Sequence, residues 1–291
     1  MAGGTDPGWL KTFGGRIEQY RDINELEFER GEIVIGVGTY MIRDLINLRA
    51  QDVIKIRYNH GFPARMTDEY RLAWSASMPT ITVSNTLVPE IERLSGTKVR
   101  AVIPNGIDTD QYFPVRGIER DAIGTIFAVH PNKAPQDIVA LMNRVAQEFP
   151  SVPRLVFSTE RRPRGLGDCH YQRSPRIERV REIYSQAVVW LLASHTEGLP
   201  APPLEAMACG AVVISTDNDG SLEVIQDGVN GLIVPKSDFD AFIEKIRLVL
   251  SNDLLRKRLV QGGFETVKRF TWANAADRME RFLEELSYVK A

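Results

Sequence analysis

The chain has 291 residues, a length typical of about two domains. Its 36 lysines and arginines nearly balance 38 aspartates and glutamates, and the resulting net charge of -2 argues against a nucleic-acid-binding protein. Hydrophobic residues make up 43% of the chain and charged residues 25%, which are ordinary values for a globular protein. No uncharged stretch reaches the roughly 18 apolar residues that a membrane-spanning helix requires.

The cysteine content and the N-terminal sequence indicate a cellular compartment. Two cysteines, Cys169 and Cys209, are too few for a disulfide framework, which favours a reducing environment. Residues 1–15 lack the apolar core with basic flanks that marks a secretion signal. These features together predict a cytoplasmic protein.

The first hundred residues alternate short apolar runs with amphipathic segments. Residues 85–95 carry apolar side chains at helical spacing. The apolar runs predict buried strands over 32–38, 53–58, 80–84 and 99–103. The last strand stops at Pro104-Asn105-Gly106, which is a turn sequence.

A second series of the same kind occupies the rest of the chain. It predicts strands over 124–129, 154–158, 188–193, 211–215 and 231–234, and helices over 135–149, 177–187 and 204–209. Ser237 and Asp240 have the spacing of a capping box before an apolar helical stripe, and helices near 253–261 and 272–289 complete the chain. Two such series, separated by a break near 104–115, predict an α/β protein with two doubly wound parallel sheets.

The segment over residues 194–210 follows a predicted strand end, where ligands of such sheets bind. Pro202 and Pro203 suit a first helical turn, and the free amides at that end of a helix favour an anion. Glu197 lies at the start of the loop and Glu205 in the first helical turn, so two carboxylates would flank a phosphate cradle and could accept bonds from sugar hydroxyls. The alternative is that Glu205 only complements the helix dipole and Glu197 is a solvated loop residue.

Three motifs resemble the GT-B-fold, retaining glycosyltransferases of family 4. They are the Glu-x7-Glu pattern within residues 197–210, the hinge-like sequence from Pro104 to Asp108, and the pattern from Asp219 to Pro235. Among the members of that family, some rhamnosyltransferase-like proteins look nearest. The resemblance implies two Rossmann-like domains that face each other across a cleft.

The same resemblance divides the chain into three parts. Residues 1–110 would form an acceptor-side domain and residues 111–270 a domain that binds the nucleotide sugar. Residues 271–291 would form a helix that packs back toward the first domain, because their apolar side chains recur at helical spacing. About 105 residues precede the hinge motif, fewer than the usual domain size, so either a natural short form or an internal start at Met1 would account for them.

The resemblance also implies a role for each donor-binding residue. Glu205 would bind the ribose hydroxyls of the donor, and Glu197 the hydroxyls of the transferred sugar. The backbone amides of Gly198 and Leu199 would face the sugar and the diphosphate. Lys133 matches the lysine that neutralises the leaving diphosphate, where a fixed cation can replace a metal.

Three further positions receive weaker assignments. Tyr171 and Gln172 fall where the loop that contacts the nucleobase would lie, with a plain surface loop as the alternative. His60, which follows a predicted strand end, would orient the acceptor or act as a structural turn residue.

The chain departs from the family pattern at the start of the second domain. Members carry Gly-Arg where this chain has His130, which would contribute to donor binding as a neutral-leaning substitute for the arginine. Either Arg161 or Arg162 could compensate for the missing arginine. Pro200 stands where many members have glycine, and it removes an amide donor and restricts φ.

No metal and no cofactor are expected from the sequence. The two Asp-x-Asp sequences, at 108–110 and 217–219, fall in the hinge motif and in a loop, and His170 beside Cys169 has no further ligands at metal spacing. Together with these absences, the resemblance implies a metal-independent, hexosyl-type glycosyltransferase (EC 2.4 class). It would move a sugar with retention from a nucleoside-diphosphate sugar to a saccharide or glycolipid acceptor, in polysaccharide biosynthesis, with contact at the inner membrane face as an open alternative.

Two other functions compete with this prediction. The missing arginine, Pro200 and the short first half would suit a catalytically impaired GT-B relic that acts as a binding or partner subunit. A GT-B epimerase or phosphorylase is a third candidate, although the cofactor lysine segment of a phosphorylase is not found in the sequence.

Overall fold

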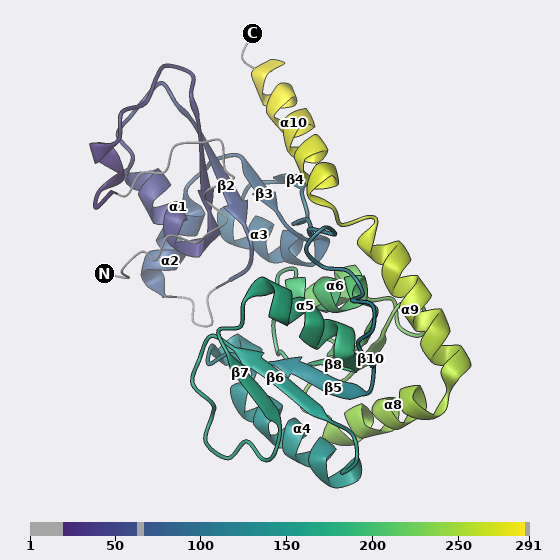
Figure 1. Cartoon of the computed structure of the whole chain (residues 1–291). Coiled ribbons are helices and arrows are strands. Elements are labelled where there is room, and N and C mark those ends of the chain that lie inside the picture. Colours follow the sequence, from purple (N-terminus) through teal and green to yellow (C-terminus); the bar gives the residue numbers. More distant parts are fainter. Residues whose placement is uncertain (1–19, 63–66, 289–291) are drawn as a thin grey trace.

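The computed structural model describes residues 20–62 and 67–288, which form two α/β domains (Figure 1). Each domain is built on a sheet whose strands all pair in parallel. The first sheet has the strand order β1-β2-β3-β4 and the second the order β10-β9-β8-β5-β6-β7. The predicted fold class, with two parallel-sheet domains, is confirmed.

In the first domain, helices cover the sheet between successive strands. The strands are β1 (Ile33–Val37), β2 (Ile54–Asn59), β3 (Thr80–Thr82) and β4 (Val99–Val102), and the helices are α1 (Gly38–Asn47), α2 (Asp68–Ser75) and α3 (Val88–Ser95). Helices α1 and α2 have no clear signal in the sequence and were not predicted. Ile42 of α1 and Trp74 of α2 are fully buried and pack with Ile91 of α3, so tertiary contacts stabilise these short helices.

The second domain contains the remaining elements. Its strands are β5 (Ala122–Ile126), β6 (Arg154–Ser158), β7 (His170–Arg173), β8 (Ala187–Leu192), β9 (Val212–Thr216) and β10 (Leu232–Val234). Its helices are α4 (Pro135–Glu148), α5 (Ile177–Gln186), α6 (Ala201–Ala208), α7 (Gly220–Val224), α8 (Phe239–Ser251) and α9 (Asp253–Val267). Every residue of β8 and β9 is buried, as expected for central parallel strands covered on both faces.

Several local predictions in this domain were wrong. Helix α6 begins at Ala201 and not at residue 204, because prolines are compatible with a first helical turn, and Glu205 therefore lies in the second turn. Asp238, not Ser237, caps α8: its carboxylate accepts a hydrogen bond from the amide of Ala241 at 2.9 Å. The backbone of Ser237 has a φ of +59°, which turns this residue away from the capping position.

The chain crosses between the domains twice, and the two crossings lie side by side. The amide of Ile107 donates a hydrogen bond to the carbonyl of Phe270 at 2.8 Å, and Ile107 forms a parallel bridge with Thr271. Helix α10 (Trp272–Tyr288) then runs along the first domain (Figure 1). Its residues Phe282 and Leu286 are buried against the first sheet. The domain boundaries at residues 110 and 270 stay a prediction.

Further observations bear on the chain as a whole. Among the residues that the structure describes, no helix is both long enough and apolar enough to cross a membrane. Cys169 and Cys209 are both free thiols.

In the interface between the domains, Glu223 of α7 accepts hydrogen bonds from the amide of Thr86 at 2.9 Å and from the side chain of Asn85 at 3.2 Å.

Candidate active site

Glu205 lies on α6 and is held by two tyrosines. The hydroxyl of Tyr184, which comes from α5, donates a hydrogen bond to the Glu205 carboxylate at 2.7 Å, and Tyr112 also hydrogen-bonds it. Burial raises the pKa of the Glu205 carboxyl above its ordinary value, while the two hydrogen bonds act in the opposite direction. The two tyrosines thus fix the orientation of a half-buried carboxylate.

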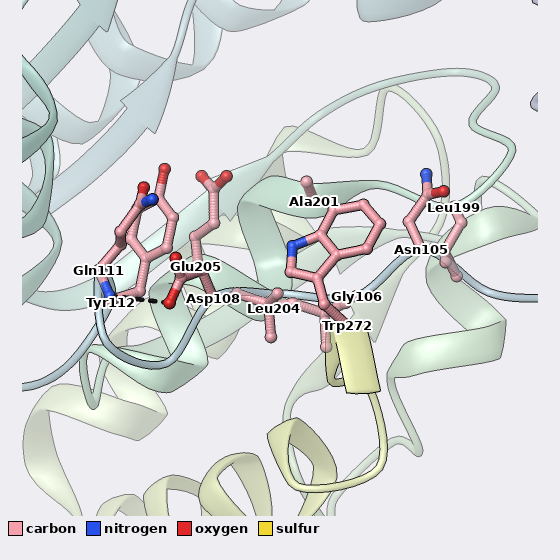
Figure 2. Close-up of a pocket in the computed structure, with 11 residues that line it drawn as sticks. Asn105, Gly106, Asp108, Gln111, Tyr112, Leu199, Ala201, Leu204, Glu205 and Trp272 are labelled. Carbon is pink, nitrogen blue, oxygen red and sulfur yellow. Dashed lines mark hydrogen bonds between the residues drawn. The ribbon is translucent and has the colours of Figure 1, made fainter. Parts of the chain in front are cut away.

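A cavity of about 280 Å³ opens beside Glu205 (Figure 2). The segment from Asn105 to Asp108 forms one part of its wall, and Leu199 and α6 form another. Tyr112 and Trp272 complete it. The hinge-like motif of the sequence is therefore part of the same cavity as Glu205, and this contact could not be read from the sequence.

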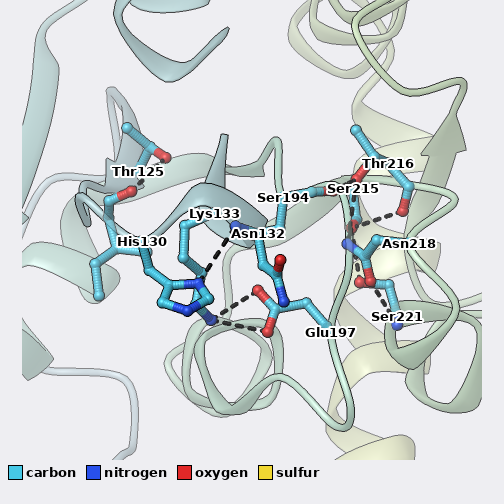
Figure 3. A network of polar contacts seen from close by, with 11 residues as sticks. Thr125, His130, Asn132, Lys133, Ser194, Glu197, Ser215, Thr216, Asn218 and Ser221 are labelled. Atoms are coloured by element: carbon cyan, nitrogen blue, oxygen red, sulfur yellow. Dashed lines mark hydrogen bonds and ion pairs between the residues drawn. The ribbon is translucent and has the colours of Figure 1, made fainter. Parts of the chain in front are cut away.

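Glu197 forms an ion pair with Lys133 (Figure 3). The Lys133 ammonium lies 2.7 Å and 2.8 Å from the two oxygens of the Glu197 carboxylate. The side chain of Glu197 is only 8% exposed, whereas that of Lys133 is 34% exposed. An ammonium has three N–H donors, so one donor of Lys133 remains for a further anion after Glu197 has accepted two.

The turn that carries Lys133 is held against the loop between β8 and α6, residues 193–200, which we call the signature loop. Lys133 ends a short 3-10 turn over residues 131–133, at the start of α4. The amide of His195 donates a hydrogen bond to the carbonyl of Asn132 at 2.8 Å. The ring of His195 lies 2.8 Å from the carboxylate of Asp137 in the first turn of α4. His195 therefore acts by positioning the lysine turn.

A buried polar network supports Glu197 from the other side (Figure 3). Asn218 lies in its centre: its carbonyl accepts a hydrogen bond from the amide of Glu197 at 3.3 Å, and its side-chain oxygen accepts one from the amide of Ser221 at 2.9 Å. Its amide group donates to the hydroxyl of Thr216 at 3.1 Å, which in turn donates to the carbonyl of Ser194. These contacts join the loop after β8 to the loop after β9.

A second cavity, of about 150 Å³, lies between the two domains. The first domain contributes His60, Gly61, Phe62 and Leu87 to its wall, and the second contributes His130, Asn132, Lys133 and the segment 196–198. Gly198 lines this cavity and Leu199 lines the larger one, so the two cavities adjoin along the signature loop. The structure thus brings His60, Lys133 and Glu197 together at the smaller cavity, and it places Glu205 at the adjoining, larger cavity.

His60 presents an unsatisfied polar atom at this interface. Its Nε2 atom is buried and has no hydrogen-bond partner among the residues that the structure describes. Burial lowers the pKa of the imidazole below its ordinary value, which favours the neutral form. The ring of Tyr58 packs edge-on against it, with 4.5 Å between the ring centroids. A neutral imidazole here could hydrogen-bond a hydroxyl of a bound molecule.

The domains approach each other most closely at Gly198. A Cβ atom added there would lie 2.0 Å from the carbonyl oxygen of His60. We expect Gly198→Ala to separate the domains at this point and to lower the free energy of unfolding by about 1–3 kcal/mol, as overpacking does. Thermal unfolding measures the effect, together with an assay for the sugar transfer that the sequence predicts, which should fall together with stability.

Gly31→Ala is the control for that substitution. Gly31 has a φ of +83°, but an added Cβ would meet no atom within 4 Å. An alanine is strained at this φ, so the replacement should cost stability. Because the added Cβ touches nothing, activity should not change. An unchanged melting temperature for Gly198→Ala would show that the domains do not meet here in solution.

Tyr171 and Gln172 line neither cavity. They belong to the edge strand β7 and not to a loop, so the expected local structure was wrong, while their contact with the nucleobase stays a prediction. The Tyr171 hydroxyl donates to the carbonyl of Glu160 at 2.9 Å, and Gln172 accepts from Arg179 at 3.1 Å. Arg162 does not replace the missing arginine either, since it donates to backbone carbonyls of its own loop, at 2.6 Å for Gly167.

Two parallel-sheet domains that are joined by a double crossover and enclose a cavity between them define a GT-B fold. The structure superposes on the pneumococcal O-GlcNAc transferase GtfA, solved in complex with UDP and GlcNAc, with a TM-score of 0.74. The superposition covers 90% of this chain and 58% of that one at 17% sequence identity, so the likeness is one of fold.

The sequence narrows this class further. Residues 169–266, from the edge strand β7 to the last turn of α9, match the family described as Glycosyl transferases group 1. The second domain thus carries the sequence pattern of group 1 glycosyl transferases.

Two curated relatives agree with that family. An uncharacterized glycosyltransferase of Methanocaldococcus jannaschii, MJ1178, is 36% identical over 97 residues, which are 33% of this chain and 28% of that protein. The putative glycosyltransferase EpsD of Bacillus subtilis is 27% identical over 210 residues, which cover 63% of this chain and 54% of EpsD. The matches thus span about a quarter to a half of these relatives' lengths.

Proposed function

We propose that this protein is a retaining, metal-independent glycosyltransferase that moves a hexosyl group from a nucleoside-diphosphate sugar to a saccharide or glycolipid acceptor. The observation that carries the proposal is the arrangement of the two glutamates in adjoining cavities, with Lys133 at the smaller one. The nucleoside would occupy the cavity of Glu205 and the sugar that of Glu197. The diphosphate would then lie along the amides of Gly198 and Leu199.

The residues around the smaller cavity suggest how transfer would proceed. The bond between the anomeric carbon and the diphosphate breaks, and a bond from that carbon to the acceptor oxygen forms. Negative charge grows on the diphosphate, where the free donor of Lys133 would stabilise it. The proton of the acceptor hydroxyl would pass to the leaving phosphate, while His60 would orient that hydroxyl.

The assay for this function offers UDP-hexoses and a deoxyhexose donor such as TDP-rhamnose with saccharide and glycolipid acceptors. Nuclear magnetic resonance of the product reports whether the anomeric configuration is retained. A glycolipid acceptor would bring the protein to a membrane surface, which co-sedimentation with lipid vesicles tests. An inverted product would contradict the retaining mechanism.

A second function is favoured by two observations. Pro200 precedes the first residue of α6 and offers no amide to a phosphate, and His130 stands where the family carries an arginine near Lys133. These features would suit a relic that binds nucleotide sugars without transferring them. Calorimetry with UDP combined with the transfer assay separates the alternatives, because a relic of this kind would show binding without turnover.

Transfer should not require a divalent metal. Lys133 and the amides of the signature loop would supply the positive charge that a metal provides in other transferases. Activity should therefore persist in excess EDTA at the rate measured without it. Complete loss of activity that manganese restores would overturn this part of the proposal.

A further inference from the structure

Glu223 is a carboxylate of the second domain that binds the start of a helix in the first domain. One of its oxygens accepts a hydrogen bond from the backbone amide of Thr86, and the other accepts one from the side-chain amide of Asn85. Asn85 and Thr86 open a 3-10 turn over residues 85–87 that continues directly into α3. The first amides of a helix have no partners within it, and the helix dipole favours a carboxylate there. Glu223 therefore caps this helix from the other domain.

The helix does not obtain this cap from its own chain. Ser84 occupies the capping position, and serine is a common capping residue. Its hydroxyl, however, lies 2.9 Å from the hydroxyl of Thr86 and not on a backbone amide. The cap thus depends on how the two domains meet.

Helix α7, which carries Glu223, is tied to the signature loop. A Cβ atom on Gly220, the first residue of α7, would lie 2.7 Å from the carbonyl oxygens of both Glu197 and Gly198. Asn218 binds the amides of Ser221 and Glu197, so it joins the same two segments (Figure 3). A movement of α7 would therefore displace the loop that carries Glu197.

The capped turn belongs to the other wall of the smaller cavity. Leu87, the last residue of the turn, is buried and lines this cavity together with His60. Leu199 of the signature loop packs against the apolar cluster of the first domain that contains Leu87. The contacts of Glu223 thus hold the turn that forms one wall against the loop that forms the other.

The same contacts are accessible to water. Asn85 and Thr86 are exposed and Glu223 is half-buried, so water can replace these hydrogen bonds at a modest cost in free energy. The crossings between the domains are joined separately, through Ile107 and Phe270. The domains can therefore part at Glu223 and remain connected at the crossings.

We propose that Glu223 is a positioning residue that latches the two domains in the arrangement where His60 meets Lys133 and Glu197. The latch consists of Glu223 with Asn85 and Thr86. Its consequence for turnover rests on the proposed function: an open latch would separate the acceptor side of the cavity from the donor side. A nucleotide bound to the second domain alone would be unaffected.

Kinetics on latch variants test this consequence. Glu223→Ala should lower kcat/KM for the acceptor by about 10-fold, the effect of losing exposed hydrogen bonds to a carboxylate. Glu223→Gln retains an oxygen that accepts hydrogen bonds, although more weakly than a carboxylate does, and should fall between Glu223→Ala and the unmodified protein. The Kd for UDP, measured by calorimetry, should stay the same in both variants.

Glu265→Ala is the matched control. Glu265 is an exposed glutamate of the same domain, and its carboxylate is bound by Gln261 and Lys268 of its own helix. Its removal should change neither kcat/KM nor UDP binding.

A distance measurement tests the latch without any enzymatic assay. Leu72 of α2 and Leu254 of α9 are 75% and 81% exposed, so cysteines at these positions can carry spin labels in a Cys169→Ser background. Double electron–electron resonance should give one narrow distance distribution for the latched protein. Glu223→Ala should add a second population of distances, whereas Glu265→Ala should not.

A charge placed opposite Glu223 tests whether this contact itself is responsible. Asn85→Asp would set a second carboxylate against Glu223 and should open the domains further than Glu223→Ala does. In the Glu223→Gln background the same substitution should have much less effect, because contacting residues are not additive.

The two levels of the proposal fail in different ways. Distance distributions that stay unchanged in both Glu223→Ala and Asn85→Asp would overturn the latch, and so would full turnover in a variant whose domains have opened. Absence of UDP binding and of sugar transfer in the unmodified protein would instead overturn the proposed function, and the distance measurement would still decide whether Glu223 joins the domains.

Discussion

Replacing Lys133 by methionine is expected to lower kcat by about 100- to 1,000-fold, the effect of removing one fixed donor from a developing negative charge. The physical reason is that the Lys133 ammonium is the cation that the signature loop holds at the smaller cavity. Methionine is one atom shorter than lysine and keeps an unbranched apolar chain, but it removes the charge and the N–H donors. Steady-state kinetics with a nucleoside-diphosphate sugar measures the loss.

Lys98→Met is the matched control for this substitution. Lys98 also forms an ion pair, at 2.7 Å from Glu92, but its side chain is 87% exposed. It lines neither of the two cavities. Exposed pairs contribute little, so both stability and activity should be unchanged. A decrease in kcat of similar size in the two variants would contradict a specific role for Lys133.

The same pair predicts a stability effect that is distinct from catalysis. In Lys133→Met the nearly buried Glu197 carboxylate loses its counter-charge, which should lower the melting temperature. Adding Glu197→Gln removes that uncompensated charge, so the double variant should recover stability while staying inactive. Recovery of both properties would mean that the pair only maintains the fold.

Glu205→Gln is expected to weaken UDP binding by about 1.5–3 kcal/mol, the contribution of a hydrogen bond to a charged group. Glutamine keeps the shape of the side chain, but a neutral amide accepts weaker hydrogen bonds from ribose hydroxyls than a carboxylate does. The bare nucleoside diphosphate and the complete donor should be affected alike, because both contain the ribose. Calorimetry on the variant and the unmodified protein measures the difference.

Glu197→Gln is the comparison variant for Glu205→Gln. The proposed partner of Glu197 is the sugar, so UDP binding should stay nearly intact while kcat falls, as for an interaction that counts in the transition state. The structure adds that Glu197 positions Lys133, which strengthens the expected loss of turnover. Equal losses of UDP affinity in the two variants would contradict the division of roles between the glutamates.

The alternation of elements and the position of the signature loop were determined by the sequence alone. Central strands such as β8 and β9 are buried on both faces, and a strand of that kind appears as an unbroken apolar run that can be recognised locally. The loop after such a strand necessarily lies at the carboxyl edge of the sheet, where ligands bind. The apolar run over residues 188–193 is therefore enough to predict that Glu197 lies at a ligand site.

Short or strained elements could not be predicted from such apolar patterns. Helices α1 and α2 have ten and eight residues, and their stability comes from buried contacts such as that of Trp74 rather than from a long periodic stripe. The cap of α8 shifted by one residue because Ser237 adopts a positive φ. A capping motif in sequence carries no information about the backbone dihedral that it needs.

The composition of the site was decided only by the tertiary structure. Lys133 and Glu197 are 64 residues apart, yet their charged groups lie within 3 Å of each other, because the lysine turn packs against the signature loop through Asn132 and His195. Trp272 meets the cavity of Glu205 because the chain crosses twice between the domains at Gly106. Side-chain periodicity tells which face of an element is buried and not which distant segment covers it, so these pairings required the folded chain.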